Sequence, residues 1–222
     1  MNKQTRLLIF DWDGTLVNSI DRIVASLQVA AGKCGIQPPT DAQARAIIGL
    51  SLVEAFPVLY PHINDADISA SFRQAYVDNY FLLEQQPSQF YPGVRDALDN
   101  FKTAGYQLAV ATGKSRRGLD HMLRSHDMLD FFHITRCADE TKSKPDPLML
   151  QQILQHLRQQ PEHAIMVGDS PYDLRMANQA QVPGVAVSYG AQPLEILLAE
   201  RPALSIDKFS ELGDWLEQNN RT

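Results

Sequence analysis

The sequence predicts an α/β fold: a doubly wound parallel sheet, Rossmann-like in layout, with an inserted helical domain. Residues 7–10 form a short and almost continuous apolar run, as expected for a strand buried on both faces. Residues 18–83 then have a helical pattern with no convincing strand. From Pro92 onward strands and helices alternate, which is typical of a parallel sheet with right-handed crossovers.

The insert is expected to contain four helices, over residues 20–32, 40–49, 51–60 and 65–83. Thr40 and Gln43 have the spacing of a capping box at the start of the second helix, and Pro57 bends the third. A polar linker, residues 84–91, returns the chain to the sheet. We therefore expect a core domain of residues 1–16 and 88–222, and an inserted helical domain of residues 17–87.

The second half of the core is expected to alternate regularly between strands and helices. Apolar runs such as YQLAVAT and AIMV predict buried strands, and amphipathic stretches between them predict helices. The strands are expected at residues 106–112, 131–137, 164–167 and 184–188, and the helices at 94–105, 115–128, 147–160 and 171–181. A short strand ending at Ile206 and a helix over residues 209–219 complete the chain.

Composition argues against several functional classes. The 222 residues carry a formal net charge of −6, which is unfavourable for binding nucleic acid or an anionic membrane. Two widely separated cysteines, Cys34 and Cys137, are typical of free thiols in a reducing compartment. The N-terminal apolar run is too short for a signal peptide, and no run approaches a membrane span. We expect a cytoplasmic protein; protein partners cannot be read from the sequence.

Chemically active residues follow four of the predicted strands. In a parallel sheet the carboxyl ends of the strands share one edge, so these residues are expected to meet there. The first strand ends in Asp11 and Asp13, and the later ones are followed by Thr112-Gly113-Lys114-Ser115, by Lys144, and by Gly168-Asp169 through Asp173. Each piece has an ordinary alternative, such as a turn or a solvated loop. All four groups follow successive strands of one alternating strand–helix pattern, and this order favours a single site.

That site has the composition of a phosphoryl-transfer centre. Four carboxylates gathered together repel one another unless a cation neutralises them, and all-oxygen ligands favour Mg²⁺ before Ca²⁺. A calcium loop starting at Asp11 is not favoured, because its twelfth position is Arg22. Thr112, Lys144 and a helix N-terminus complement an anionic group beside the metal. Carboxylates, Mg²⁺ and an anion pocket together indicate phosphoryl transfer.

These motifs resemble those of the haloacid dehalogenase-like (HAD) hydrolase superfamily over nearly all of the chain. The four motifs are Asp11-Trp12-Asp13-Gly14-Thr15, Thr112, Lys144, and Gly168-Asp169 through Asp173. The resemblance implies that Asp11 is the nucleophile that becomes phosphorylated and that Asp13 is the acid/base group. It implies that Thr112, Gly113 and Lys144 bind the phosphoryl group. It also implies an Mg²⁺ site of Asp11, the backbone carbonyl of Asp13, Asp169 and Asp173.

The resemblance also separates activities within the superfamily. Asp13 and the acidic pair Asp169 and Asp173 favour a phosphatase over a dehalogenase, because a halide leaves without a protonating acid. The insert resembles the cap of the phosphoglycolate phosphatase-like branch, which implies a small phosphorylated metabolite as substrate, phosphoglycolate being one candidate. Two alternatives stay open: a mutase related to β-phosphoglucomutase, and a phosphate-sensing or interaction protein with little turnover.

Three further residues are candidates for substrate specificity. Gly49 lies in a loop, residues 47–51, that looks like the one reaching the site in that branch. Arg45 is expected either to meet a substrate carboxylate when the cap closes or to be a solvated helix residue. Lys114 either extends the positive edge beside the anion cradle or is solvated. Gly113 departs from the asparagine that many relatives have there, which leaves the substrate open.

Overall fold

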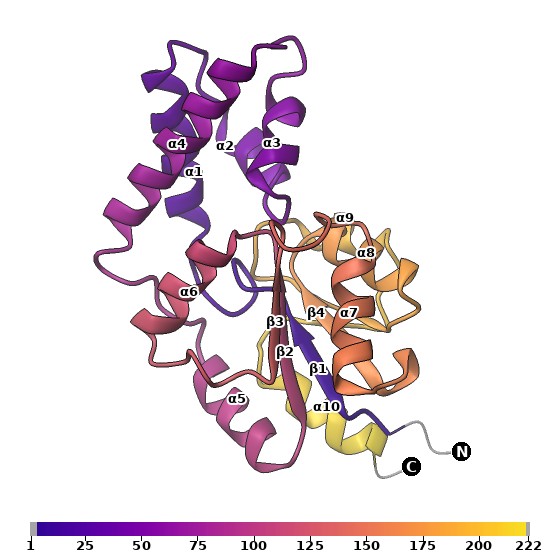
Figure 1. Ribbon diagram of the computed structural model, residues 1–222. Helices are drawn as coiled ribbons and strands as arrows, with labels where there is room; N and C mark the ends of the chain where they lie inside the picture. The colour runs from indigo at the N-terminus through magenta and orange to yellow at the C-terminus, as the bar shows by residue number, and fades with distance from the viewer. Residues whose placement is uncertain (1–3, 221–222) are drawn as a thin grey trace.

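A computed structural model describes residues 4–220, and its centre is a six-stranded parallel sheet in the order β3-β2-β1-β4-β5-β6 (Figure 1). β1 pairs with β2 on one side and β4 on the other, so it lies where the strand order reverses. The strands are β1 (Leu7–Phe10), β2 (Gln107–Thr112), β3 (Ile134–Cys137), β4 (Ala164–Gly168), β5 (Gly184–Val187) and β6 (Leu204–Ile206). In such sheets ligands bind beyond the carboxyl ends of the strands at the reversal point.

Helices cover both faces of the sheet because the strand residues alternate between two apolar clusters. Leu8 and Phe10 of β1 face the layer that contains α5 (Val94–Thr103), α6 (Arg116–Ser125) and α10 (Glu211–Asn220). Leu7 and Ile9 face the layer that contains α7 (Leu148–Leu157) and α8 (Pro171–Gln179). A short helix, α9 (Leu194–Leu198), packs through Leu197 against Ala186 of β5. The doubly wound fold predicted from the sequence is confirmed.

Four helices inserted between β1 and α5 form a separate group above the carboxyl edge of the sheet (Figure 1). They are α1 (Ile20–Lys33), α2 (Asp41–Ala46), α3 (Leu52–Leu59) and α4 (Ala66–Leu83). α1 packs along α4, and Phe56 of α3 contacts Phe72 of α4 with ring centroids 5.2 Å apart. The capping box of Thr40 and Gln43 is present, and Pro57 lies inside α3 as predicted. We call this group the cap.

The chain leaves the core and returns to it at one place. The amide of Asn18 donates to the carbonyl of Gln89 at 2.9 Å, and the amide of Tyr91 donates to the carbonyl of Leu16 at 3.0 Å. The two connecting segments therefore lie side by side. We propose this crossing as the hinge between the two domains, residues 1–16 with 88–222 and residues 17–87.

Some predicted element ends differ from the structure. The strand predicted over residues 131–137 begins at Ile134, because Phe131 and Phe132 pack against each other in a preceding turn instead of extending. The helix predicted over residues 115–128 ends at Ser125. Helix α9 and a single 3₁₀ turn, Pro161–His163, were not predicted, since each is shorter than two helical turns and has no clear period.

Candidate active site

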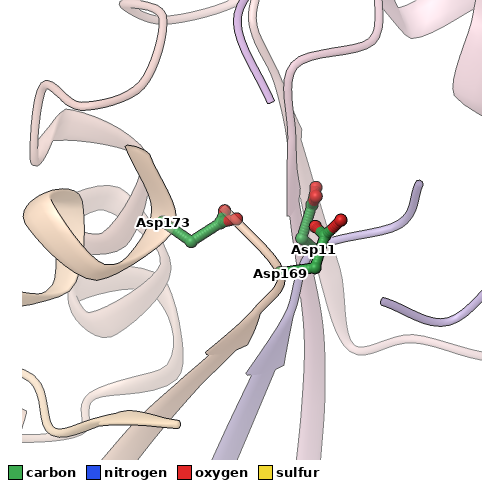
Figure 2. Close-up of side chains that lie close together, drawn as sticks. All are labelled: Asp11, Asp169 and Asp173. Atoms are coloured by element: carbon green, nitrogen blue, oxygen red, sulfur yellow. The ribbon is translucent and has the colours of Figure 1, made fainter. Parts of the chain in front are cut away.

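Three buried aspartates meet at the carboxyl edge of the sheet, and we call them the acidic cluster. Asp11 directly follows β1, and its amide continues the ladder by donating to the carbonyl of Val167 at 2.9 Å. Asp169 directly follows β4, and Asp173 lies in the first turn of α8. One carboxylate oxygen from each lies within 4.8 Å of the others. Figure 2 shows Asp173 reaching from its helix toward Asp11 and Asp169.

Lys144 is the counter-charge within the acidic cluster. Its ammonium lies 2.6 Å from Oδ1 of Asp11 and 2.6 Å from Oδ1 of Asp173, with the lysine side chain fully buried. Burial lowers the pKa of Lys144, but the charges of Asp11 and Asp173 outweigh that effect and raise it. The lysine is therefore held as a cation between two carboxylates.

The ionised forms of Asp11 and Asp169 are disfavoured in this buried site even with Lys144 beside them. Burial raises the pKa of Asp11 to about 7; Lys144 counteracts this, while the charge of Asp173 adds to it. Burial also raises the pKa of Asp169 well above its usual range, and the charges of Asp11 and Asp173 raise it further. Both shifts have the same cause, because negative charge is concentrated where water cannot solvate it.

Neighbouring groups fix the orientation of the cluster. Asp169 accepts hydrogen bonds from the amide of Ala191 at 2.7 Å and from Oγ1 of Thr15 at 3.3 Å. Asp173 accepts from Oγ of Ser170 at 2.6 Å in a capping box that begins α8. Gly14 has φ +79°, and a Cβ there would lie 2.0 Å from Oδ2 of Asp169, so only glycine fits against this carboxylate.

The donor set fits a hard divalent cation. When all three carboxylates are ionised, the single ammonium of Lys144 leaves two negative charges uncompensated. Oδ2 of Asp11 is buried and has no hydrogen-bond partner, although a buried carboxylate oxygen normally has one. An Mg²⁺ ion bound by oxygens of the cluster would supply both the missing charge and the missing partner. The cluster is thus compatible with the predicted metal site.

Asp13 lies in a second charged pair beside the cluster. Its Oδ2 lies 3.0 Å from the ammonium of Lys114, and its Oδ1 accepts from Oγ of Ser19 at 2.6 Å. The same ammonium donates to the hydroxyl of Tyr80 on α4 at 3.0 Å and lies 4.2 Å from that ring's centroid. Burial lowers the pKa of Lys114, but Asp13, Tyr76 and Glu84 together outweigh that effect and raise the pKa. Lys114 thereby links the core to the cap.

A cavity of about 980 Å³ opens over these residues, between the cap and the core. Its lining includes Asp11, Asp13, Thr112, Gly113, Lys114 and Lys144, together with apolar side chains of α3 and α4. Thr112 is 1% exposed at the end of β2, and its Oγ1 accepts from the amide of Lys114 at 3.2 Å. The residues predicted to bind a phosphoryl group and those predicted to attack it therefore face one space.

The loop before α3 lies directly on the core. The amide of Ser51 donates to Oγ of Ser143 at 2.9 Å, and the hydroxyl of Tyr172 donates to the carbonyl of Ala46 at 3.1 Å. Gly49 is among the residues lining the cavity. Arg45 is not among them: its guanidinium pairs with Asp21 at 2.6 Å, with more than a third of the side chain exposed. In this arrangement Arg45 has the surface role considered as the alternative.

Sequence reasoning did not find the residues that orient the site. Ser19 and Tyr80 contact the Asp13–Lys114 pair, and Ser143 receives the cap loop. A serine or tyrosine in a helical pattern carries no spacing signal for such contacts, since they depend on how the cap lies on the core. Ser170 was detectable, because Ser170 and Asp173 have capping-box spacing before α8.

Comparison with known proteins identifies the family. The model of the haloacid dehalogenase-like hydrolases matches residues 8–187. The chain is 35% identical over 210 residues to "Probable phosphatase IndB" of Dickeya dadantii, covering 93% of this chain and 91% of that protein. It is 27% identical over 221 residues to a phosphoglycolate phosphatase of Vibrio vulnificus, covering 96% of each. A hydrolase of Pseudomonas syringae shares the fold, with TM-score 0.88 over 96% of this chain and 99% of that one at 19% identity.

This chain belongs to the haloacid dehalogenase-like hydrolases, in their phosphoglycolate phosphatase-like branch. The enzyme class predicted from the sequence, a HAD-like phosphoric monoester hydrolase, is confirmed. Among residues 4–220, none of the helices combines the length and the apolar character that crossing a bilayer requires.

Proposed function

We propose that the enzyme hydrolyses small phosphomonoesters in an Mg²⁺-dependent reaction through a phosphoryl group carried on Asp11. The observation that carries this proposal is the acidic cluster itself: three buried carboxylates and one lysine, in which Asp11 lines the cavity and has one oxygen without a hydrogen-bond partner. Asp11, Asp169 and the backbone carbonyl of Asp13 would hold the ion, with Asp173 as a direct or water-mediated ligand. Bound Mg²⁺ neutralises charge on the phosphoryl oxygens.

The first half of the reaction transfers the phosphoryl group to the protein. An oxygen of Asp11 attacks phosphorus, and the bond from phosphorus to the ester oxygen breaks. Asp13 gives its proton to that oxygen, which leaves as an alcohol. Thr112, Gly113 and Lys144 bind the phosphoryl oxygens during transfer.

The second half frees the enzyme by hydrolysis. Asp13, now a carboxylate, takes a proton from water as the water oxygen attacks phosphorus, and the bond to Asp11 breaks to release inorganic phosphate. Splitting one displacement into two in this way is the advantage of covalent catalysis. The name of the Vibrio relative makes phosphoglycolate one candidate substrate. Free thiols at Cys34 and Cys137 support a reducing compartment, and we propose the cytoplasm.

The test is hydrolysis of an aryl phosphate with and without Mg²⁺. We expect turnover with Mg²⁺, loss of turnover with chelator, and a loss of roughly a thousandfold or more in Asp11→Asn. Asp130→Asn, an exposed aspartate outside the cavity lining, is the control and should remain active. Absence of turnover across a panel of phosphate esters would favour a phosphate sensor. Phosphate found on a second hydroxyl would favour a mutase.

A further inference from the structure

The cavity between the cap and the core has two chemically different sides. The core side carries the charged and hydroxyl-bearing groups of the site, such as Asp11, Thr112 and Lys144. The cap side is mostly aliphatic and aromatic, and among the described residues it contributes only two charged side chains, Glu54 and Arg73. Such a cavity holds the charged phosphoryl group against the core and leaves the cap side to the rest of the ester.

Six side chains on the cap side form a surface that we call the apolar wall. They come from two helices: Leu52, Val53 and Val58 of α3, and Tyr76, Val77 and Phe81 of α4. None of the six is fully buried, and Val53 and Val58 are 59% and 57% exposed. Apolar side chains that gather uncovered in a cavity beside catalytic groups are typical of a surface that an apolar part of a ligand covers.

The apolar wall begins beside the reacting atoms and continues away from them along α4. Lys114 lies 3.0 Å from Asp13, the proposed proton donor to the leaving oxygen, and donates to Tyr80 at 3.0 Å. Tyr76 precedes Tyr80 by about one helical turn, or about 5–6 Å, and the two rings are stacked with centroids 5.8 Å apart. Val77 lies on the same face of the helix. A leaving group therefore contacts more of the wall as it becomes longer.

The cavity is spacious although the cap touches the core. The amide of Ser51 donates to Oγ of Ser143 at 2.9 Å, and Lys114 contacts Tyr80, so the two domains meet at two places around the site. The volume of about 980 Å³ is nevertheless near the upper end of the range for drug-sized ligands, about 300–1,000 Å³. A leaving group of only two carbons would leave most of this space, and most of the apolar wall, to water.

We infer that the preferred leaving group is a bulky, mainly apolar alcohol, with an alkyl chain or an aromatic ring that lies against the apolar wall. This inference rests on the proposed phosphatase function and narrows its substrate class. Glu54 and Arg73 carry opposite charges, so the cap side has no net charge that would select an ionised leaving group. The ammonium of Lys114 lies beside Asp13, at the phosphoryl end of the cavity. Phosphoglycolate, whose leaving group has two carbons, is accordingly not the preferred substrate.

A series of primary alkyl phosphates tests the inference: ethyl, butyl and hexyl phosphate. Their leaving alcohols differ little in acidity, so differences in kcat/KM report contacts of the alkyl chain. We expect kcat/KM to rise about two- to fourfold for each added methylene, and to be higher for hexyl phosphate than for phosphoglycolate. A flat or falling series, or a higher value for phosphoglycolate, would overturn the inference and leave the phosphatase function intact. If no ester is hydrolysed, including an aryl phosphate, the proposed function fails and this inference fails with it.

A variant of the apolar wall provides an independent check. Replacing Val53 and Val58 together by asparagine should lower the ratio of kcat/KM for hexyl phosphate to that for ethyl phosphate by about threefold or more. Both side chains are more than half exposed, so the fold does not depend on them. Leu82→Asn is the matched control on α4, because Leu82 is 60% exposed and is not among the residues lining the cavity. An unchanged ratio in the double variant, or an equal fall in Leu82→Asn, would contradict the inference.

Discussion

Replacing Lys144 by methionine tests the charge balance of the acidic cluster. Methionine keeps much of the length of the lysine side chain but removes the ammonium that lies 2.6 Å from both Asp11 and Asp173. The buried carboxylates then have no counter-charge. Removing one partner of a buried ion pair costs about 3–5 kcal/mol, because it leaves an uncompensated charge in the interior.

This loss should be visible in thermal unfolding of the metal-free protein. In a chain of this size 1 kcal/mol corresponds to about 2–4 °C, so Lys144→Met should lower Tm by about 6–20 °C near neutral pH. The measurement is circular dichroism in the presence of chelator. Mg²⁺ should recover part of the loss, since it supplies positive charge to the same carboxylates.

Lys142→Met is the matched control from the same loop. Lys142 pairs with Asp146 at 3.3 Å with 68% of its side chain exposed, and exposed pairs contribute about 0–1 kcal/mol. Its Tm should therefore change by no more than about 4 °C. If Lys144→Met in chelator also changes Tm by no more than about 4 °C, the cluster is not charged as described, and our reasoning about it is refuted.

Three further predictions follow from neighbouring contacts. The folded metal-free protein holds the proton of Asp11, with its pKa of about 7, more tightly than the unfolded chain does. Its urea midpoint should therefore fall as pH rises from about 4 to 7, and this slope should weaken in Asp11→Asn; equal slopes would contradict the shift. Asp13→Asn should reduce kcat/KM by about 10²–10⁴-fold for alkyl phosphates and much less for dinitrophenyl phosphate, whose leaving group needs no proton; a uniform loss would argue against an acid. Ser143→Ala removes the acceptor of the Ser51 amide, so hydrogen exchange at Ser51 should accelerate by about 2–10-fold, and unchanged exchange would mean that this contact does not hold the loop.

The strands and helices of the core domain could be predicted from the sequence because the strands are buried on both faces of the sheet. Apolar runs such as residues 7–10 and 164–167 stand out against amphipathic helices, and the parallel arrangement follows from their alternation. Short elements without a period, such as α9, carry no comparable signal. The end of α6 was misplaced because the backbone turns left-handed at Asp127, with φ +55°. The start of β3 was misplaced because Phe131 and Phe132 pack against each other before it.

The acidic cluster was predictable for the same topological reason. Residues that follow parallel strands must meet at one edge, and the structure brings Asp11, Asp169 and Asp173 together there. Contacts between the cap and the core were not predictable in this way. The contact of Lys114 with Tyr80 depends on the angle at which the cap lies over the sheet, which no local pattern records.

A crystal structure of the enzyme, from crystals grown with Mg²⁺, would test most directly the central claim that the acidic cluster binds this ion. We predict one octahedral ion with carboxylate oxygens of Asp11 and Asp169 about 2.0–2.1 Å away, and Asp173 bound directly or through water. An ion bound elsewhere, with Lys144 still the sole partner of Asp11 at saturating Mg²⁺, would contradict the account.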